Sequence, residues 1–498
     1  MTSGPSQQHR ALITISVMVA SIMQALDATI ANVALPRIEG SLSATQDQIA
    51  WVLTSYIIAT AIMMPLSGWL AGQFGRKRVF AASIAFFTFA SVLCGLAQTL
   101  PEMVVFRALQ GIGGAALVPM SQAVLLDINP PEHHGRAMAV WGMGVVLGPI
   151  IGPALGGWLT DDYNWRWVFY INVPFGILSF LGVVSFLGES ARRRTRFDFF
   201  GFATLSIALG ALQMMLDRGS LKDWFASTEI WVESTIAALA FYLFVVHTET
   251  ARTQPFVSPS LFRDRNFVTG NIFVFIVGVV LFATLALLPP LLQEHMGYPV
   301  LLTGLITAPR GVGTLLSMVI VGRLVGRVAT RYLILFGLAL TIISLWQMAG
   351  FSLLMDGGPV IWSGFIQGVG TGFVYVPLAA VAFATLKPEL RNEATALFNL
   401  MRNIGSSIGI SIVEALLVRN TQVMHVALAS HVTRYTGAVA APSASALAHL
   451  NRQVTEQASM IAYNDDFKLM MILTICVIPF AFLLRDVQRQ KNVAMVME

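Results

Sequence analysis

The sequence is poor in charged residues and in cysteine. Asp, Glu, Lys and Arg make up 11% of the 498 residues, less than half of the roughly 25% that is usual for soluble domains. The low charge argues against a soluble globular protein. Cys94 and Cys476, the two cysteines of the chain, both lie in apolar stretches, so a disulfide framework is not indicated.

Long apolar runs make up much of the sequence. Hydrophobic residues make up 56% of the chain. A hydrocarbon core of about 30 Å needs about 20 apolar residues of helix, and the sequence contains about fourteen such stretches, from 11–35 to 467–484. The first stretch is too long for a cleavable signal peptide and is followed by many more. These features predict an all-α polytopic membrane protein with fourteen transmembrane helices.

The distribution of Lys and Arg predicts the orientation in the membrane. With the N-terminus inside, most of the 31 basic residues fall in cytoplasmic segments. An even number of spans then places both termini in the cytoplasm. The basic run RRRTR at 192–196 is interpreted as a topology anchor rather than a nucleic-acid site, despite the net charge of +5.

Two motifs recur along the chain at nearly equal offsets of about 255 residues. GWLAGQFGRKR begins at Gly68 and GRLVGRVATR at Gly322, while a Gln-Gly pair begins at Gln110 and again at Gln367. The repeat predicts two six-helix halves, 1–191 and 259–498, separated by a two-helix insertion at 192–258. The second half includes a long external segment at 420–466. Paired six-helix halves are typical of secondary transporters, with the substrate site between them.

Several stretches also resemble a known family. LDATIANVALP at 26–36, RALQGIGGA at 107–115, GPIIGPALGG at 148–157 and WRWVFYINVPFG at 165–176 are similar to motifs of the major facilitator superfamily. MLDRGSLKDWF at 215–225 and RNEATALFNLMRNIGSSIGIS at 391–411 resemble its fourteen-spanner drug:proton antiporters of the EmrB/QacA type, and its EmrB branch in particular.

The resemblance implies an exporter that exchanges lipophilic small molecules for protons in a bacterial inner membrane. It implies a periplasmic adaptor and an outer-membrane channel as partners, and no cofactor. A stripe of apolar residues in the external segment is a candidate docking surface, although a helix lying on the membrane or packing on span 14 explains the pattern equally well. The stripe comprises Leu447, Leu450, Val454, Ala458 and Ile461.

The loop between spans 2 and 3 resembles the cytoplasmic gating loop of that family through Gly68, Gly75, Arg76 and Lys77. Gly72 occupies the position where the family usually has an acid, which argues against a charge-based lock through that residue. Gln73 replaces a basic residue, and Ala139 replaces the first glycine of the family's span 5 motif.

Span 5 carries glycine at every fourth position, so one helix face is small enough for another helix to approach closely. Two prolines remove backbone donors and favour a bend. We expect a tight, bendable interface between the halves, with ordinary close packing as the alternative. The motif comprises Gly144, Gly148, Pro149, Gly152, Pro153, Gly156 and Gly157.

Charges within the spans are the strongest functional candidates, because each costs at least a few kcal/mol near the bilayer centre. Asp27 and Arg107 are predicted to couple protons, with a purely structural ion pair as the alternative. Their helix faces predict a substrate cavity that includes Gln24 and Ala31 on span 1 and Gln110 and Gly114 on span 4.

Arg310 and Glu414 are secondary candidates for a site, and Glu414 could equally reach water at the outer interface. The sequence contains none of the HExxH, GxSxG or paired Cys/His motifs that would indicate an enzyme or a metal site. We therefore expect a proton-coupled multidrug antiporter. An exporter of a specific lipid, siderophore or metabolite and, less favoured, a passive channel are the alternatives.

Overall fold

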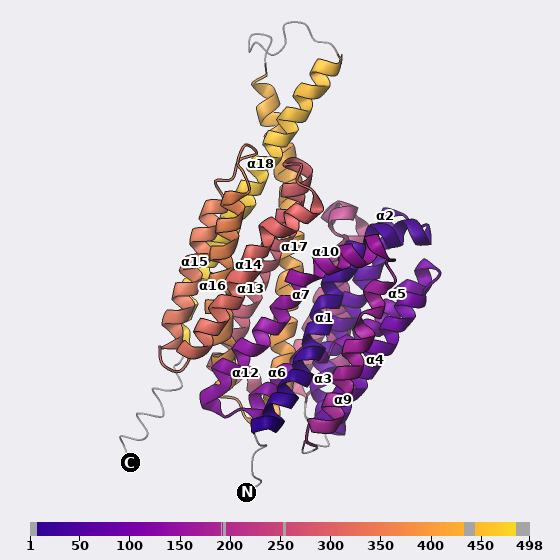
Figure 1. Cartoon of the computed structure of the whole chain (residues 1–498), viewed down its shortest axis with the longest axis vertical. Coiled ribbons are helices and arrows are strands. Elements are labelled where there is room, and N and C mark those ends of the chain that lie inside the picture. The colour runs from indigo at the N-terminus through magenta and orange to yellow at the C-terminus, as the bar shows by residue number, and fades with distance from the viewer. Residues whose placement is uncertain (1–6, 191, 193–195, 252–254, 433–443, 485–498) are drawn as a thin grey trace.

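The computed structural model describes residues 7–190, 192, 196–251, 255–432 and 444–484. Its described part is a bundle of fourteen helices that are long and apolar enough to cross a membrane. This confirms the predicted all-α polytopic fold. The helices of the first six spans lie together on one side of the bundle, and those of the last six lie together on the other (Figure 1).

The helices fall into three groups along the chain. The first group, which we call the N-terminal half, consists of α1 (Gln7–Leu42), α3 (Trp51–Phe74), α4 (Arg76–Leu96), α5 (Leu100–Gly114), α6 (Leu117–Ile128), α7 (His134–Asp162) and α9 (Asn172–Phe186), with the short α2 (Gln46–Ile49) and α8 (Trp167–Tyr170). The middle pair is α10 (Phe199–Arg218) and α11 (Thr228–Thr250). The C-terminal half consists of α12 (Ser260–Arg263), α13 (Arg265–Pro290), α14 (Val300–Leu324), α15 (Thr330–Met348), α16 (Gly358–Ala384), α17 (Arg391–Ser430), α18 (Ala444–Val477) and the terminal turn η6 (Ile478–Leu483).

Local sequence signals set where several helices begin and end. Gly75 separates α3 from α4 with a φ of +91°, a backbone conformation that disfavours residues with a side chain. Thr99 begins α5 with a capping box, in which its hydroxyl accepts from the Glu102 N–H and the Glu102 carboxylate accepts from the Thr99 N–H. α5 and α6 together form the fourth span, so the predicted span is one crossing made of two helices.

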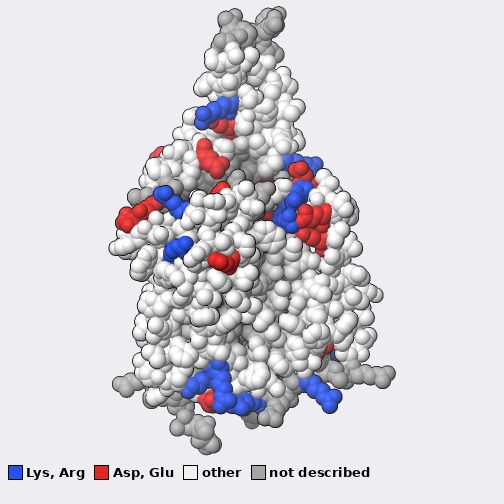
Figure 2. Space-filling model, turned by 90° about the vertical axis from the view of Figure 1, so that its right-hand side faces the viewer, with Lys and Arg blue, Asp and Glu red and all other residues white. Residues whose placement is uncertain are grey.

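The two ends of the bundle differ in charge and shape. We call the end that carries the α3–α4 turn the basic end, and the end from which α17 and α18 project the hairpin end (Figure 1). On the face shown in Figure 2, charged side chains gather near these two ends and leave an uncharged belt between them. Such a belt is what lipid tails require of a membrane-spanning surface.

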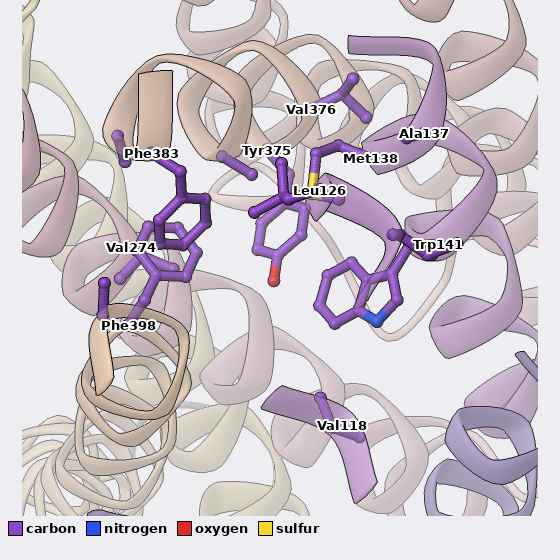
Figure 3. Close-up of a cluster of buried hydrophobic side chains, with 14 of the residues drawn as sticks. Val118, Leu126, Ala137, Met138, Trp141, Val274, Tyr375, Val376, Phe383 and Phe398 are labelled. Atoms are coloured by element: carbon purple, nitrogen blue, oxygen red, sulfur yellow. The ribbon is translucent and has the colours of Figure 1, made fainter. Parts of the chain in front are cut away.

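Side chains from both halves form one buried apolar cluster near the basic end (Figure 3). Trp141 of α7 stacks on Tyr375 of α16, with ring centroids 6.0 Å apart and planes inclined by 13°. Leu126 and Met138 contribute from the N-terminal half, and Phe398 of α17 contributes from the other. The halves are therefore packed against each other at this end.

The predicted external segment 420–466 is mostly helical where the structure describes it. α17 and α18 extend past the bundle as a helical pair, and the His425 ring lies 3.1 Å from the Asn451 amide oxygen across it (Figure 1). α18 is continuous from the apolar stripe into span 14, so this stretch does not lie flat on a membrane. Ala458 in the stripe is buried, whereas Leu447 near the start of α18 is exposed. Residues 433–443 lie outside the described residues.

The middle pair is fixed to both halves through α10. At the hairpin end, Asp217 accepts a hydrogen bond from Thr54 of α3, and Ser411 of α17 donates to the Leu216 carbonyl at 2.8 Å. At the basic end, Asp198 caps α10. Burial raises the pKa of this carboxyl, but N–H groups of Gly201 and Phe256 and the His247 ring outweigh burial and lower it overall. α10 thus covers the seam between α3 and α17. The predicted boundary residue 191 lies outside the described residues.

Candidate functional site

The structure brings Asp27 of α1 and Arg107 of α5 together as a buried ion pair. Arg107 Nη1 lies 2.9 Å from Asp27 Oδ2, and both side chains are fully shielded from solvent. The guanidinium also donates to the Val52 carbonyl at 3.2 Å and lies 4.3 Å above the Tyr56 ring. A buried charge pair is stable only when its remaining hydrogen-bonding groups are also satisfied. The neighbouring amides supply most of these bonds, and Arg107 Nη2 has no hydrogen-bond partner among the described residues.

Two amide side chains complete the hydrogen bonds of the Asp27 carboxylate. Gln110 Nε2 and Asn172 Nδ2 each donate to Asp27 Oδ1 at 2.8 Å, and Gln110 Oε1 accepts from Arg107 at 2.7 Å. Ser91 of α4 links back to Asn172 at 2.9 Å. The carboxylate is therefore held by three donors from α5 and α9. We call Asp27, Arg107, Gln110 and Asn172 the ionic cluster.

The predicted cavity-lining residues do not line an open cavity in this structure. Ala31, Gln110 and Gly114 are buried among the helices of the N-terminal half. A Cβ added to Gly114 would meet the Tyr56 hydroxyl and the Phe87 ring within 3.2 Å. Only Gln24 is partly exposed, and it donates to the Tyr56 hydroxyl at 3.1 Å. The expected cavity wall is instead the tightly packed surrounding of the ionic cluster.

The glycine face of span 5 packs inside the N-terminal half, so the expectation that it joins the two halves is wrong. Gly148 lies against the Ala25 backbone of α1, where an added Cβ would come within 2.6 Å, and Thr29 donates to the Gly148 carbonyl at 3.2 Å. Gly144, Gly152 and Gly156 also contact α1. A stripe of small residues shows only that some helix can approach closely, and in the structure that helix is α1.

Other residues of α7 make the contact between halves. Gly142 and Ala139 lie against α14, beside Met318 and Gly322, and Ile150 packs on Gly311. α7 is therefore held between α1 and α14. The helix continues unbroken through Pro149 and Pro153, and Gly157 has open space around it.

The gating-loop residues lie where the halves meet at the basic end. Arg76 pairs with Asp127 at the end of α6, and Arg391 of α17 lies 2.6 Å from the other oxygen of Asp127. Asp127 thus joins the N-terminal half to the C-terminal half without an acid at position 72. Lys77 is partly exposed beside this contact. A second link is the 2.8 Å hydrogen bond from Asn399 Nδ2 to Gln122 Oε1.

Gly68 fits closely against the start of α17. A Cβ at this position would lie 3.0 Å from the Glu393 Cα, and the Glu393 carboxylate accepts hydrogen bonds from the backbone and hydroxyl of Ser258. A cavity of about 330 Å³ lies beside this contact, lined in part by Gly72, Arg76 and Glu393. The basic end of the bundle is therefore closed by contacts between the halves.

The two secondary candidates lie apart from the ionic cluster. Arg310 of α14 is 6% exposed, and its Nη2 donates to the Leu281 carbonyl of α13 at 3.1 Å. Glu414 of α17 is exposed and lies near Asp217 of α10 at the hairpin end, within range of electrostatic repulsion.

Sequence analysis missed three residues that the structure places in these sites. Asn172 is a fully buried amide in the INVPFG stretch of span 6, and the rule that singled out buried charges would have found it if extended to amides. Asp127 and Arg391 lie at span ends, where charges are common, so no local signal distinguishes them. Among the described residues, no group of His, Cys, Asp and Glu has the proximity needed to bind a metal ion.

A many-span helical bundle with a buried ion pair in one half and a contact between halves at one end defines a membrane transporter. Residues 17–410 match the model of the Major Facilitator Superfamily, and the chain belongs to this family. It is a transporter and not an enzyme.

Two curated relatives are similar over nearly their whole length. The fatty acid resistance protein FarB of Neisseria gonorrhoeae is 37% identical, covering 95% of this chain and 96% of the relative. The multidrug export protein EmrB of Escherichia coli K12 is 36% identical, covering 92% and 91%. The solved structure of the proton:xylose symporter XylE aligns with a TM-score of 0.62 at 14% identity, covering 94% of this chain and 95% of that one, which supports the fold.

Proposed function

We propose that this protein is a proton-coupled antiporter that exports hydrophobic or amphipathic small molecules by alternating access. The names of its relatives EmrB and FarB, a multidrug export and a fatty acid resistance protein, support export of such compounds. The observation that supports the proposal of proton coupling is the ionic cluster, because Asp27 is a buried carboxylate held by one guanidinium and two amides.

The cluster suggests how a proton and a conformational change are linked. In this structure the Asp27 carboxylate pairs with the Arg107 guanidinium. Any movement that separates α1 from α5 leaves an unpaired carboxylate and an unpaired guanidinium in a low-dielectric environment, which costs several kcal/mol, and a proton taken up by the carboxylate removes one of these two charges. Protonation of Asp27 from the outer side would therefore stabilise the state in which the ion pair is broken. Release of the proton to the inner side would restore the pair with Arg107.

The driving force suffices for concentrative export. Moving one proton through about 100 mV supplies about 2.3 kcal/mol, which corresponds to a roughly fifty-fold gradient of an uncharged substrate. The contacts between the halves at the basic end close that side in this structure. In the proposed cycle, they separate when the transporter takes up substrate.

We propose that the basic end faces the cytoplasm of a bacterial inner membrane, with both termini on that side. The support is the excess of Lys and Arg in the connecting segments at this end. We further propose boundaries at 191/192 and 258/259, with α10 and α11 as the insertion. Reporters fused within 188–190 should then be cytoplasmic and those within 218–228 external; an internal 218–228 would contradict both proposals.

The hairpin end is the proposed docking surface for a periplasmic adaptor. Val423 and Val426 on α17 and Leu447 on α18 are exposed apolar side chains beyond the bundle. Changing Val426 and Leu447 to Asp should abolish co-purification with the adaptor. The same change at Leu354, an exposed leucine in the α15–α16 connection, serves as the control. Unchanged co-purification of the double variant would rule out docking here.

The decisive test of antiport is substrate-driven proton movement in proteoliposomes. Asp27→Asn keeps the volume and polarity of the side chain but cannot titrate, so we expect coupled export to be lost while the protein still inserts. Asp161→Asn is the matched control, because Asp161 pairs with Arg37 at 3.2 Å on the exposed surface. Undiminished coupling in Asp27→Asn would leave Asp27 a structural partner only.

A further inference from the structure

The internal repeat allows the ionic cluster to be compared with the same place in the C-terminal half. The offset that aligns Gln110 with Gln367 also aligns Asp27 with Thr284 and Arg107 with Gly364. The amide is retained, because Gln367 Nε2 donates to the Thr284 hydroxyl at 3.2 Å. The carboxylate and the guanidinium of the pair are absent from these positions.

A guanidinium nevertheless reaches this place from a different helix. Arg310 of α14 lies against Gly364 and Gly368 of α16, where a side chain at Gly364 would meet the Arg310 Cβ at 3.6 Å. Its Nη2 donates to the Leu281 carbonyl, one helical turn before Thr284 on α13. The C-terminal half thus holds an arginine beside the counterpart of Asp27, without the acid.

The hydrogen bonds around Arg310 are incomplete. Within the described part of the chain, Arg310 Nη1 and Gln367 Oε1 are both buried and have no hydrogen-bond partner. No carboxylate of the described residues lies within ion-pair distance of this guanidinium, whose one protein acceptor is a backbone carbonyl. A buried cation without an anion is costly, and the fork of a guanidinium matches the two oxygens of a carboxylate.

The helix that carries Arg310 meets the N-terminal half at the neighbouring residue. The next residue, Gly311, packs directly on Ile150 of α7 in the N-terminal half. Leu281 and Gln367, which lie near Arg310, also line a small, mostly apolar cavity of about 30 Å³ inside the C-terminal half, between α13, α15, α16 and α18. That volume holds little more than a water molecule. Separation of α14 from α7 would expose the face of α14 that carries Gly311, next to Arg310.

We propose that Arg310, assisted by the second N–H of Gln367 Nε2, binds the carboxylate of an amphipathic organic acid between the two halves. The carboxylate of the bound acid pairs with Arg310 in the C-terminal half, as Asp27 pairs with Arg107 in the N-terminal half. The apolar part of the acid lies along α13 and α16. This assignment deepens the proposed export function by naming its substrate class and the residue that selects it.

The test compares binding of an acid with that of its neutral counterpart. The probes are 11-(dansylamino)undecanoic acid and its primary amide, titrated by dansyl fluorescence into the purified full-length protein. We expect the wild type to bind the acid at least about tenfold more tightly than the amide. Arg310→Met should remove this preference, whereas Arg323→Met, which removes an exposed arginine of the same helix, should retain it.

A second variant keeps the arginine and covers the case in which Arg310→Met fails to fold. Thr284→Asp supplies an internal carboxylate at the position aligned with Asp27, and should abolish the preference by pairing with Arg310. A wild type that binds acid and amide equally would overturn the proposal, and so would a folded Arg310→Met or Thr284→Asp variant that keeps the preference.

Proton-coupled export of the cation ethidium in vesicles tests the proposed function separately. Coupled ethidium export without an acid preference would reject the Arg310 site alone. An Arg310-dependent acid preference without coupled transport of either probe would reject the antiporter function while the site remains.

Discussion

Two buried arginines of this protein differ in what surrounds them, and the difference assigns them different roles. Arg107 has a carboxylate, an amide oxygen and a backbone carbonyl as acceptors, whereas Arg310 has a single carbonyl. Burial alone therefore does not identify the function of a charge. The partners do: in the part of the chain that the structure describes, each guanidinium has one buried nitrogen without a partner, but Arg107 pairs with a carboxylate of the protein, which favours an internal switch, whereas Arg310 has no anion, which favours a binding site.

Replacing Arg107 with lysine tests whether the geometry of the pair matters beyond its charge. Lysine keeps the positive charge but lacks the planar fork that joins Asp27, Gln110 and the Val52 carbonyl. We expect the rate of proton-coupled export to fall by about tenfold or more, equivalent to about 1.4 kcal/mol. The measurement is initial export rate in proteoliposomes. Arg37→Lys, in the exposed pair with Asp161, should keep the wild-type rate; equal rates for both variants would contradict the role of the fork.

At the scale of elements, helix existence follows from composition, whereas helix contacts do not. The apolar runs predicted all fourteen spans, because a span must satisfy its own backbone in lipid. They did not predict that α17 and α18 continue past the bundle, since hydropathy reports only the apolar part of each helix. The glycine stripe of α7 was visible in the sequence, but the same pattern fits any close neighbour. Its partner, α1, could be identified only from the structure.

Gly148→Ala should show how closely α7 must approach α1. An alanine Cβ would lie 2.6 Å from the Ala25 backbone, which has no flexible atoms to move aside. We expect destabilisation of about 1–3 kcal/mol, as for overpacking, and loss of export. Gly157→Ala on the same helix has open space around it, and should be neutral or stabilising by up to about 1 kcal/mol through helix propensity. Unfolding temperature in detergent measures both, and equal values would contradict the packing argument.

At the scale of the whole molecule, the seam between the halves determines which side is closed. The sequence predicted Asp27 and Arg107 as a functional pair because both are charges inside spans, where charges are costly. It could not predict the Asp127–Arg391 contact, which joins the end of α6 to the start of α17, about 265 residues away. Charges at span ends are common, and only the packing of the halves brings this pair together. The residues that close the basic end are therefore a property of the assembled bundle.

Removing the link across the seam should shift the protein toward a state that is open at the basic end. Arg391→Ala eliminates the contact with Asp127 while Arg76 still neutralises that carboxylate, so the N-terminal half keeps its own pair. A partly buried ion pair contributes about 1 kcal/mol, which corresponds to an about fivefold change in population.

Spin labels at Phe74 and Lys387, exposed positions on opposite halves, report the separation in a background where Cys94 and Cys476 are replaced by alanine. We expect a longer-distance component to grow in Arg391→Ala and not in Arg263→Ala, which removes an exposed arginine at the same end. Identical distance distributions in the two variants would show that Asp127–Arg391 does not hold the basic end closed, and would leave the Gln122–Asn399 bond and the stacked Trp141–Tyr375 pair to do so.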